Sequence, residues 1–192
     1  MSERAPDGFG EHQPVKGPRK KKGLLIVNTG NGKGKTTAAF GMALRAWGRG
    51  MRVAVYQFIK PPTANFGEHR AAKRIGLPVH PLGDGFTWKS KDPERTRALA
   101  IEQWGRACRA MFSGELDVLV LDEFTYVLHY GWLPASEVLA ALADRPPLLH
   151  VVITGRYAPA ELVAAADLVT EMTLVKHPYR EQGIKAQPGV EF

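Results

Sequence analysis

A loop of glycines, lysines and threonines has the clearest capacity for chemistry in this sequence. It follows an apolar run at residues 24–27 and precedes a helical pattern at residues 35–47. Glycines let the backbone turn with positive φ and bring its amides close to oxyanions, and a helix start adds unpaired N–H groups. We therefore predict a nucleotide phosphate site formed by Gly30, Asn31, Gly32, Lys33, Gly34, Lys35, Thr36 and Thr37. Lys35 would neutralise phosphate oxygens, and the Thr36 hydroxyl would join a Mg²⁺ shell.

This loop departs from the usual P-loop pattern at one position. The pattern G-x-x-x-x-G-K-[ST] begins with glycine, whereas that position here is Thr29 and the glycine follows at Gly30. The loop is therefore expected to hold phosphates somewhat differently from an ordinary NTPase. A glycine-rich turn without a ligand is the alternative, and it leaves the two lysines and two threonines unexplained.

Two acidic residues end the apolar run at residues 118–121. Asp122 and Glu123 are expected at the carboxyl end of a buried strand, which in an open α/β sheet lines the ligand crevice. A carboxylate there can hold magnesium directly or through water, as in a Walker B strand. Taken alone the pattern is weak, because a helix cap for the next segment would give the same residues.

Two basic residues are expected near the same crevice. Arg156 follows the apolar run at residues 149–153, and a guanidinium there suits a phosphate or carboxylate. Lys60 ends the run Gln57–Lys60 in a similar position. A surface salt bridge is the alternative role for Arg156, and Lys60 is equally compatible with a structural role.

Two aromatic residues, Phe86 and Trp88, lie in a glycine-flanked loop before a long helical pattern. They could fold back as a lid on the core, or they could form a flat hydrophobic wall for a planar substrate. Periodicity does not decide between these interpretations.

Short apolar runs alternate with helical patterns over most of the chain, which is typical of an α/β fold with a mostly parallel sheet and helices on both faces. Strands are expected at residues 24–27, 53–58, 78–82, 118–121, 149–153 and 168–174. Helices are expected at residues 35–47, 67–75, 92–112, 134–142 and 159–166.

Composition limits the class of protein. The chain has 192 residues, one cysteine, 44% hydrophobic residues and a net charge of +7, as in a soluble globular protein. It has no apolar stretch near the roughly 18 residues needed to span a bilayer and no signal-peptide core, so we expect a cytoplasmic protein with no membrane partner. Lone Cys108 excludes a disulfide framework, and the six scattered histidines predict no zinc site.

Residues 1–22 are rich in proline, glycine and charge, and we predict a flexible basic N-terminal arm before one domain at residues 23–192. The run Arg19–Lys22 is interpreted as a solvated flank. Because polyphosphate ligands attract a mildly basic body as readily as DNA does, we predict no nucleic-acid partner.

Six segments recur in this order in one enzyme family: Thr29–Gly41, Gln57–Lys60, Gly85–Trp88, Val120–Tyr126, Ile153–Arg156 and Gly183–Gln187. On these motifs the chain resembles the P-loop ATP:corrinoid adenosyltransferases, also called cob(I)yrinic acid a,c-diamide adenosyltransferases, over about residues 23–192. The displaced first glycine is a feature of that family. The resemblance implies a P-loop NTPase (RecA-like) fold.

The resemblance also implies a reaction. Such enzymes move the 5′-deoxyadenosyl group of ATP onto the Co(I) centre of a corrinoid and release triphosphate, so no side-chain nucleophile is needed. It implies that Lys35 and Arg156 serve catalysis and that Thr36, Asp122 and Glu123 serve Mg²⁺. It further implies that Phe86 and Trp88 pack against the corrin and displace the lower cobalt ligand, easing reduction to Co(I). A flavoprotein electron donor and a homodimer are the implied partners.

Two alternatives share part of this evidence. An ordinary P-loop ATPase or small-molecule kinase would yield ADP with phosphate or a phosphorylated product, and the shifted glycine and the Phe86–Trp88 loop argue against it. A RecA-like DNA-binding module would show steeply salt-dependent DNA affinity. The confinement of the charge excess to a short arm argues against that module.

Overall fold

Parallel strands form the centre of the fold. The computed structural model describes residues 21–85 and 92–191, and within them the sheet has six strands in the order β3-β2-β4-β5-β1-β6. Each neighbouring pair in this order is parallel. The strands are β1 (Leu25–Thr29), β2 (Val53–Gln57), β3 (Val79–Pro81), β4 (Val118–Asp122), β5 (His150–Thr154) and β6 (Leu168–Glu171).

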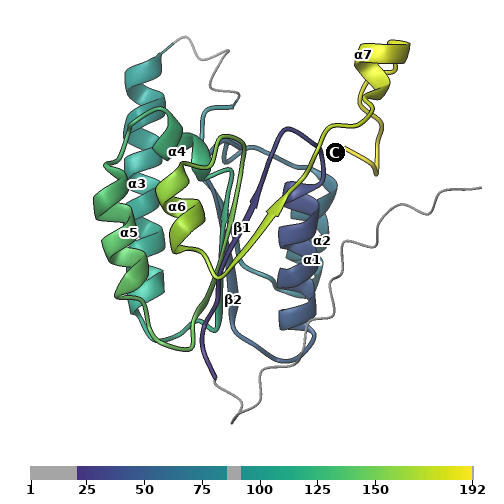
Figure 1. Ribbon diagram of the computed structural model, residues 1–192. Helices are drawn as coiled ribbons and strands as arrows, with labels where there is room; N and C mark the ends of the chain where they lie inside the picture. The colour runs from purple at the N-terminus through teal and green to yellow at the C-terminus, as the bar shows by residue number, and fades with distance from the viewer. Residues whose placement is uncertain (1–20, 86–91, 192) are drawn as a thin grey trace, which may run out of the picture.

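Helices cover both faces of this sheet. Figure 1 shows α3, α4, α5 and α6 on one side and α1 and α2 on the other. The helices are α1 (Lys35–Trp47), α2 (Gly67–Ile75), α3 (Pro93–Phe112), α4 (Thr125–His129), α5 (Ala135–Ala143), α6 (Ala160–Ala165) and α7 (Pro178–Gln182). The described residues include no helix that is both long and apolar enough to cross a membrane.

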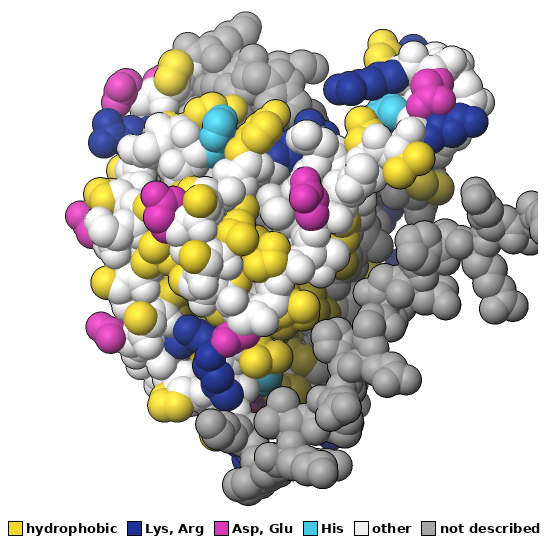
Figure 2. All heavy atoms as spheres, viewed as in Figure 1, with side chains coloured by type: hydrophobic (Ala, Val, Ile, Leu, Met, Phe, Trp, Pro, Cys, Tyr) yellow, Lys and Arg dark blue, Asp and Glu magenta, His cyan; other side chains and the backbone are white. Residues whose placement is uncertain are grey.

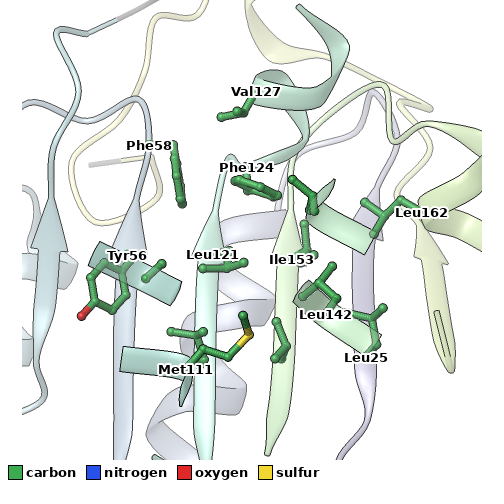
Figure 3. Close-up of a cluster of buried hydrophobic side chains, with 14 of the residues drawn as sticks. Leu25, Tyr56, Phe58, Met111, Leu121, Phe124, Val127, Leu142, Ile153 and Leu162 are labelled. Carbon is green, nitrogen blue, oxygen red and sulfur yellow. The ribbon is translucent and has the colours of Figure 1, made fainter. Parts of the chain in front are cut away.

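Successive strand residues point to opposite faces, so the sheet packs against two separate cores. Leu25 and Val27 face α3, α5 and α6, whereas Ile26 faces the small residues of α1. Figure 3 shows the first core, in which Phe58, Leu121 and Phe124 gather beside Ile153 and Leu142. Both faces of β2, β4 and β5 are covered, which explains their uninterrupted apolar runs.

The predicted fold class and element order are confirmed, with three differences at the level of elements. The last strand ends at Glu171 and not at residue 174, because its partner β1 ends at Thr29 and the chain then turns across the loop after β1. Helices α4 and α7, five residues each, were not predicted. Helices this short contain too few residues to show a helical period.

The C-terminal segment stands apart from the body. In Figure 1, α7 projects beyond the edge of the sheet formed by β6. Figure 2 shows that this segment carries hydrophobic, basic and acidic side chains together. Val175, Tyr179 and Val190 are largely exposed there. One contact joins the end of this segment to the body, an ion pair between Lys33 in the loop after β1 and Glu191.

Candidate active site

The loop between β1 and α1 has the backbone of a phosphate-binding turn. Gly30 and Gly34 adopt positive φ angles of 91° and 100°, a conformation that glycine adopts without strain. Gly34 directly precedes α1, and the first amides of a helix have no hydrogen-bond partner within the helix. The ammonium of Lys35 folds back over the loop and donates to the carbonyl oxygens of Gly30, at 2.9 Å, and Gly32, at 2.5 Å.

Close packing against the end of β6 also requires glycine in this loop. A Cβ atom at Gly30 or at Gly32 would lie 2.6 Å from the carbonyl oxygen of Met172. The Gly32 amide donates to that same oxygen at 2.6 Å, and the Met172 amide donates to the carbonyl of Thr29 at 2.9 Å. The backbone after β6 therefore holds the loop from one side.

The fully buried carboxylate of Asp122 lies at the centre of the site and accepts hydrogen bonds from four side chains. Its Oδ1 accepts from the hydroxyls of Thr36 and Thr154, both at 2.8 Å. Its Oδ2 accepts from the Gln57 amide and the Lys60 ammonium, both at 3.0 Å. Because β4 lies between β2 and β5, the carboxyl ends of three neighbouring strands bring Gln57, Lys60 and Thr154 to Asp122. Thr36 reaches the same carboxylate from the first turn of α1.

Charge pairing keeps this buried cluster ionised. Burial alone would raise the pKa of Asp122, but the Lys60 cation and the hydrogen bonds from Thr154 and Gln57 hold that pKa below its usual value. Burial alone would lower the pKa of Lys60, but the Asp122 and Glu123 carboxylates outweigh it and raise that pKa. Lys60 therefore remains a cation, and Asp122 remains an anion.

Glu123 is in a less favourable environment. Burial and the neighbouring Asp122 carboxylate raise the pKa of Glu123 to about 7, although Lys60, Lys35 and Arg156 act in the opposite direction. Its backbone adopts a positive φ of 62°, which costs a non-glycine residue free energy. Its amide donates to the Thr154 hydroxyl at 2.8 Å, so the same threonine supports both acidic residues.

Arg156 approaches the site from the loop after β5. Its charge lowers the pKa of Lys35, after the larger effect of burial, and also acts on Glu123. The Thr125 hydroxyl donates to the Arg156 carbonyl at 2.5 Å, and Gly155 has a φ of 139° that fits it closely against Thr125. The backbone that carries Arg156 is thus fixed from α4.

Aromatic rings continue the surface beyond Arg156. Tyr157 stacks on His129 with ring centroids 4.6 Å apart and meets the Tyr126 ring edge-on at 6.3 Å. His129 therefore makes a packing contact. His177 caps α7 instead, because its Nδ1 accepts from the amides of Tyr179 and Arg180.

The predicted site residues other than the three loop glycines fall into three groups. Lys35, Thr36, Asp122, Glu123 and Arg156 converge at the carboxyl edge of the sheet. Asn31, Lys33 and Thr37 have exposed side chains on the loop and first turn of α1. Phe86 and Trp88 lie outside the described residues.

The sequence prediction gave no role to two side chains of this cluster, Gln57 and Thr154. Each is a polar residue that ends a buried strand, and that position is the signal by which they could have been found.

The parallel sheet, the glycine loop with Lys35 and the strand-end carboxylates together define a P-loop nucleotide-binding protein of the α/β class. A match to a protein-family sequence model identifies the family within this class. The chain belongs to the family described as ATP:corrinoid adenosyltransferase BtuR/CobO/CobP, whose model matches residues 21–192.

Individual relatives agree with this family. A protein of Pseudomonas aeruginosa named corrinoid adenosyltransferase is 46% identical over 91% of this chain and 86% of its own length. The Salmonella typhimurium corrinoid adenosyltransferase CobA is 42% identical over 91% of this chain and 88% of its own length. The flagellar accessory protein FlaH from Methanocaldococcus jannaschii has 12% identity and a TM-score of 0.50, covering 79% of this chain and 71% of its own; that likeness concerns the fold alone.

Proposed function

We propose that this protein transfers the 5′-deoxyadenosyl group of ATP to the Co(I) centre of a corrinoid and releases triphosphate. The cobalt electron pair forms a bond to the ribose 5′-carbon, and the electrons of the broken C5′–O bond leave with the triphosphate. The observation that carries the proposal is the convergence of Lys35, Thr36 and Asp122 in a chain that belongs to this family. None of these side chains needs to act as a nucleophile.

In this proposal the loop after β1 binds the leaving group. Negative charge grows on the triphosphate as the C–O bond breaks, and preorganised donors stabilise such charge most strongly. The Lys35 ammonium is held over the loop by two carbonyl oxygens. When phosphate oxygens enter the loop, the ammonium can exchange these neutral acceptors for charged ones. Arg156 adds a second cation from the adjacent loop.

The donor set of the site fits a magnesium ion bound together with ATP. The Thr36 hydroxyl lies 2.8 Å from Oδ1 of Asp122, and Glu123 adds a third oxygen donor beside them. Hard cations of this kind prefer oxygen ligands and keep several waters. Thr36, Asp122 and Glu123 would hold the ion, directly or through water. When bound, it would supply positive charge to the triphosphate.

Phe86 and Trp88 are assigned to the corrin by family resemblance. Replacing both with alanine should cripple the reaction that starts from Co(II) and leave ATP affinity intact. An equal loss of activity with chemically reduced Co(I) would contradict their role in displacing the lower cobalt ligand. The resemblance also supports a homodimer and a flavoprotein reductant, and a cytoplasmic location stays the expectation drawn from the sequence composition.

One incubation tests the proposed reaction. The protein is mixed with ATP, Mg²⁺ and a corrinoid reduced to Co(I), and the products are analysed by anion-exchange chromatography and visible absorbance. We expect triphosphate and a cobalt–carbon bond that light cleaves, in equal amounts. Release of orthophosphate at the same rate with and without corrinoid would overturn the proposal in favour of an ordinary ATPase.

A further inference from the structure

A chain of hydrogen bonds leads from helix α2 to the buried carboxylate of the site. The middle residue of this chain is Gln57, which has no exposed surface and pairs in register with Asp122 across β2 and β4. The Gln57 side chain donates from Nε2 to Oδ2 of Asp122 at 3.0 Å. Its other amide atom, Oε1, lies 2.6 Å from Nε2 of His69 on α2. Gln57 therefore links a helix on the surface to the centre of the site.

The partners of the His69 ring fix the position of its proton. The backbone amide of Phe66 lies 3.1 Å from Nδ1, and because an amide can only donate, Nδ1 must accept. In the neutral ring the proton is then on Nε2, which donates to Oε1 of Gln57. Burial, the largest influence, lowers the pKa of His69 and so favours this neutral form.

This proton position in turn fixes the orientation of the Gln57 amide. With Oε1 facing a donor, Nε2 must face the carboxylate. A reversed amide would place its oxygen against Oδ2 of Asp122 and its NH₂ against the His69 N–H. Since Gln57 and Lys60 occupy Oδ2, the other oxygen, Oδ1, is directed to Thr36 and Thr154.

We infer that His69 is a positioning residue for the phosphate and metal site: acting through Gln57, it holds Asp122 with Oδ1 facing the Thr36 hydroxyl. This His69–Gln57 relay rests on the proposed role of Thr36 and Asp122. Hydrogen bonds to a ligating or water-binding carboxylate orient it, and their loss typically lowers metal affinity by roughly 10- to 100-fold. The competing role of His69 is purely structural, as the cap that accepts from the Phe66 amide at the start of α2.

Two variants separate these roles. His69→Ala removes both the cap and the relay, whereas Gln57→Met removes the relay and leaves the cap in place. His80→Ala is the matched control, because the His80 ring contacts Tyr56, with ring centroids 4.8 Å apart and planes tilted by 33°, and is not part of the relay. His69→Gln keeps one acceptor, Oε1, and one donor, Nε2, and serves as the conservative rescue.

The measurement is ATP binding by calorimetry at increasing Mg²⁺ concentration, with urea unfolding recorded for each variant. We expect His69→Ala and Gln57→Met each to raise the half-saturating Mg²⁺ concentration roughly 10-fold. The double variant should be no worse than either single one, because the two residues act in one chain. His69→Gln should recover part of the loss, and His80→Ala should leave the Mg²⁺ dependence unchanged.

Four results would overturn the inference. His69→Ala that lowers stability with an unchanged Mg²⁺ dependence would make His69 a helix cap alone. Nitrogen NMR showing the ring proton on Nδ1 would contradict the relay directly. Thr36→Val, compared with Thr36→Ser, tests the underlying site. If Thr36→Val weakens Mg²⁺-dependent binding while the relay variants do not, the relay is wrong and the site stands. If it has no effect, the metal assignment fails and the relay fails with it.

Discussion

The Thr36 hydroxyl donates a 2.8 Å hydrogen bond to Oδ1 of Asp122, although 86 positions separate the two residues in the chain. Thr36 lies in the first turn of α1 and Asp122 ends β4, so this contact joins the phosphate loop to the acidic strand end. The fold itself holds the two groups side by side. Preorganisation of this kind lowers the cost of binding a charged ligand.

Lys35→Ala should remove the main cation of the phosphate site. We expect triphosphate release in the presence of Co(I) corrinoid to fall by roughly 100-fold or more, as is typical for loss of one preorganised electrostatic contact. The measurement is triphosphate production at saturating ATP. Lys73→Ala is the control, since Lys73 is exposed in the last turn of α2. Near-normal release from Lys35→Ala would remove the assignment of this loop to the triphosphate.

Asp122→Asn should destabilise the fold as well as the site. The substitution leaves the Lys60 ammonium, whose side chain is only 16% exposed, without its closest counter-charge. Breaking a buried ion pair from one side costs about 3 kcal/mol or more. Urea unfolding at pH 7 measures this loss.

The double variant Lys60→Met with Asp122→Asn controls for the loss of the carboxylate itself. It should recover part of the stability, because it removes the uncompensated cation. Equal destabilisation in the single and double variants would show that the charge of Lys60 is not the cause.

Glu123→Gln should stabilise the protein at alkaline pH. The pKa of Glu123 is raised to about 7 in the folded chain, so the folded state holds this proton more tightly than the unfolded state. Stability contributed by the protonated carboxyl is therefore present at pH 4 and is lost as the pH rises toward 7. Glutamine stays neutral and avoids this loss. We expect equal stabilities near pH 4 and an advantage for the variant on the order of 2 kcal/mol at pH 8.

Urea titrations at both pH values measure this difference. Glu115→Gln, at an exposed position before β4, should show no such pH-dependent gain. A Glu123→Gln variant whose stability parallels the parent across this range would contradict the raised pKa.

Gly155→Ala should disturb the backbone that carries Arg156. A methyl group there would overlap the Thr125 hydroxyl, and the φ of 139° is unfavourable for alanine. The matched control is Gly50→Ala, which also has a positive φ, of 75°, but has open space around its Cβ position. Unfolding should show a loss larger by about 2 kcal/mol at Gly155 than at Gly50. Equal losses would mean that backbone strain alone matters there and that contact with Thr125 does not.

Much of this architecture could be predicted from the sequence because its signals are local. The apolar runs gave strands within a few residues of their observed ends, and Asp92 and Pro93 marked the start of α3, where the Asp92 carboxylate accepts from the Arg95 amide. The candidate site followed from the same signals, since parallel strands place their carboxyl ends at one edge.

The sequence did not indicate which strands and helices lie next to one another, and the contacts that depend on this could not be predicted. Lys60 was expected at the crevice in either a ligand-binding or a structural role, and it lies there paired with Asp122, a partner that the sequence did not indicate. That pairing depends on β2 and β4 being neighbours in the sheet. The pattern of apolar residues within a segment predicts a strand but not its position in the sheet. The His69–Gln57 contact depends on how α2 packs beside the sheet, so no spacing rule could have indicated it.

The backbone hydrogen bonds between Met172 and the loop after β1 have a consequence for the C-terminal segment. The Gly32 amide is already engaged by the Met172 carbonyl, so the amides that follow it are left to receive oxyanions. These hydrogen bonds join the loop to the chain that runs from β6 into the C-terminal segment, so we expect a movement of the loop on ATP binding to reach that segment. A fluorophore attached near residue 179 should accordingly change its emission when ATP binds. The C-terminal segment would then report whether the nucleotide site is occupied.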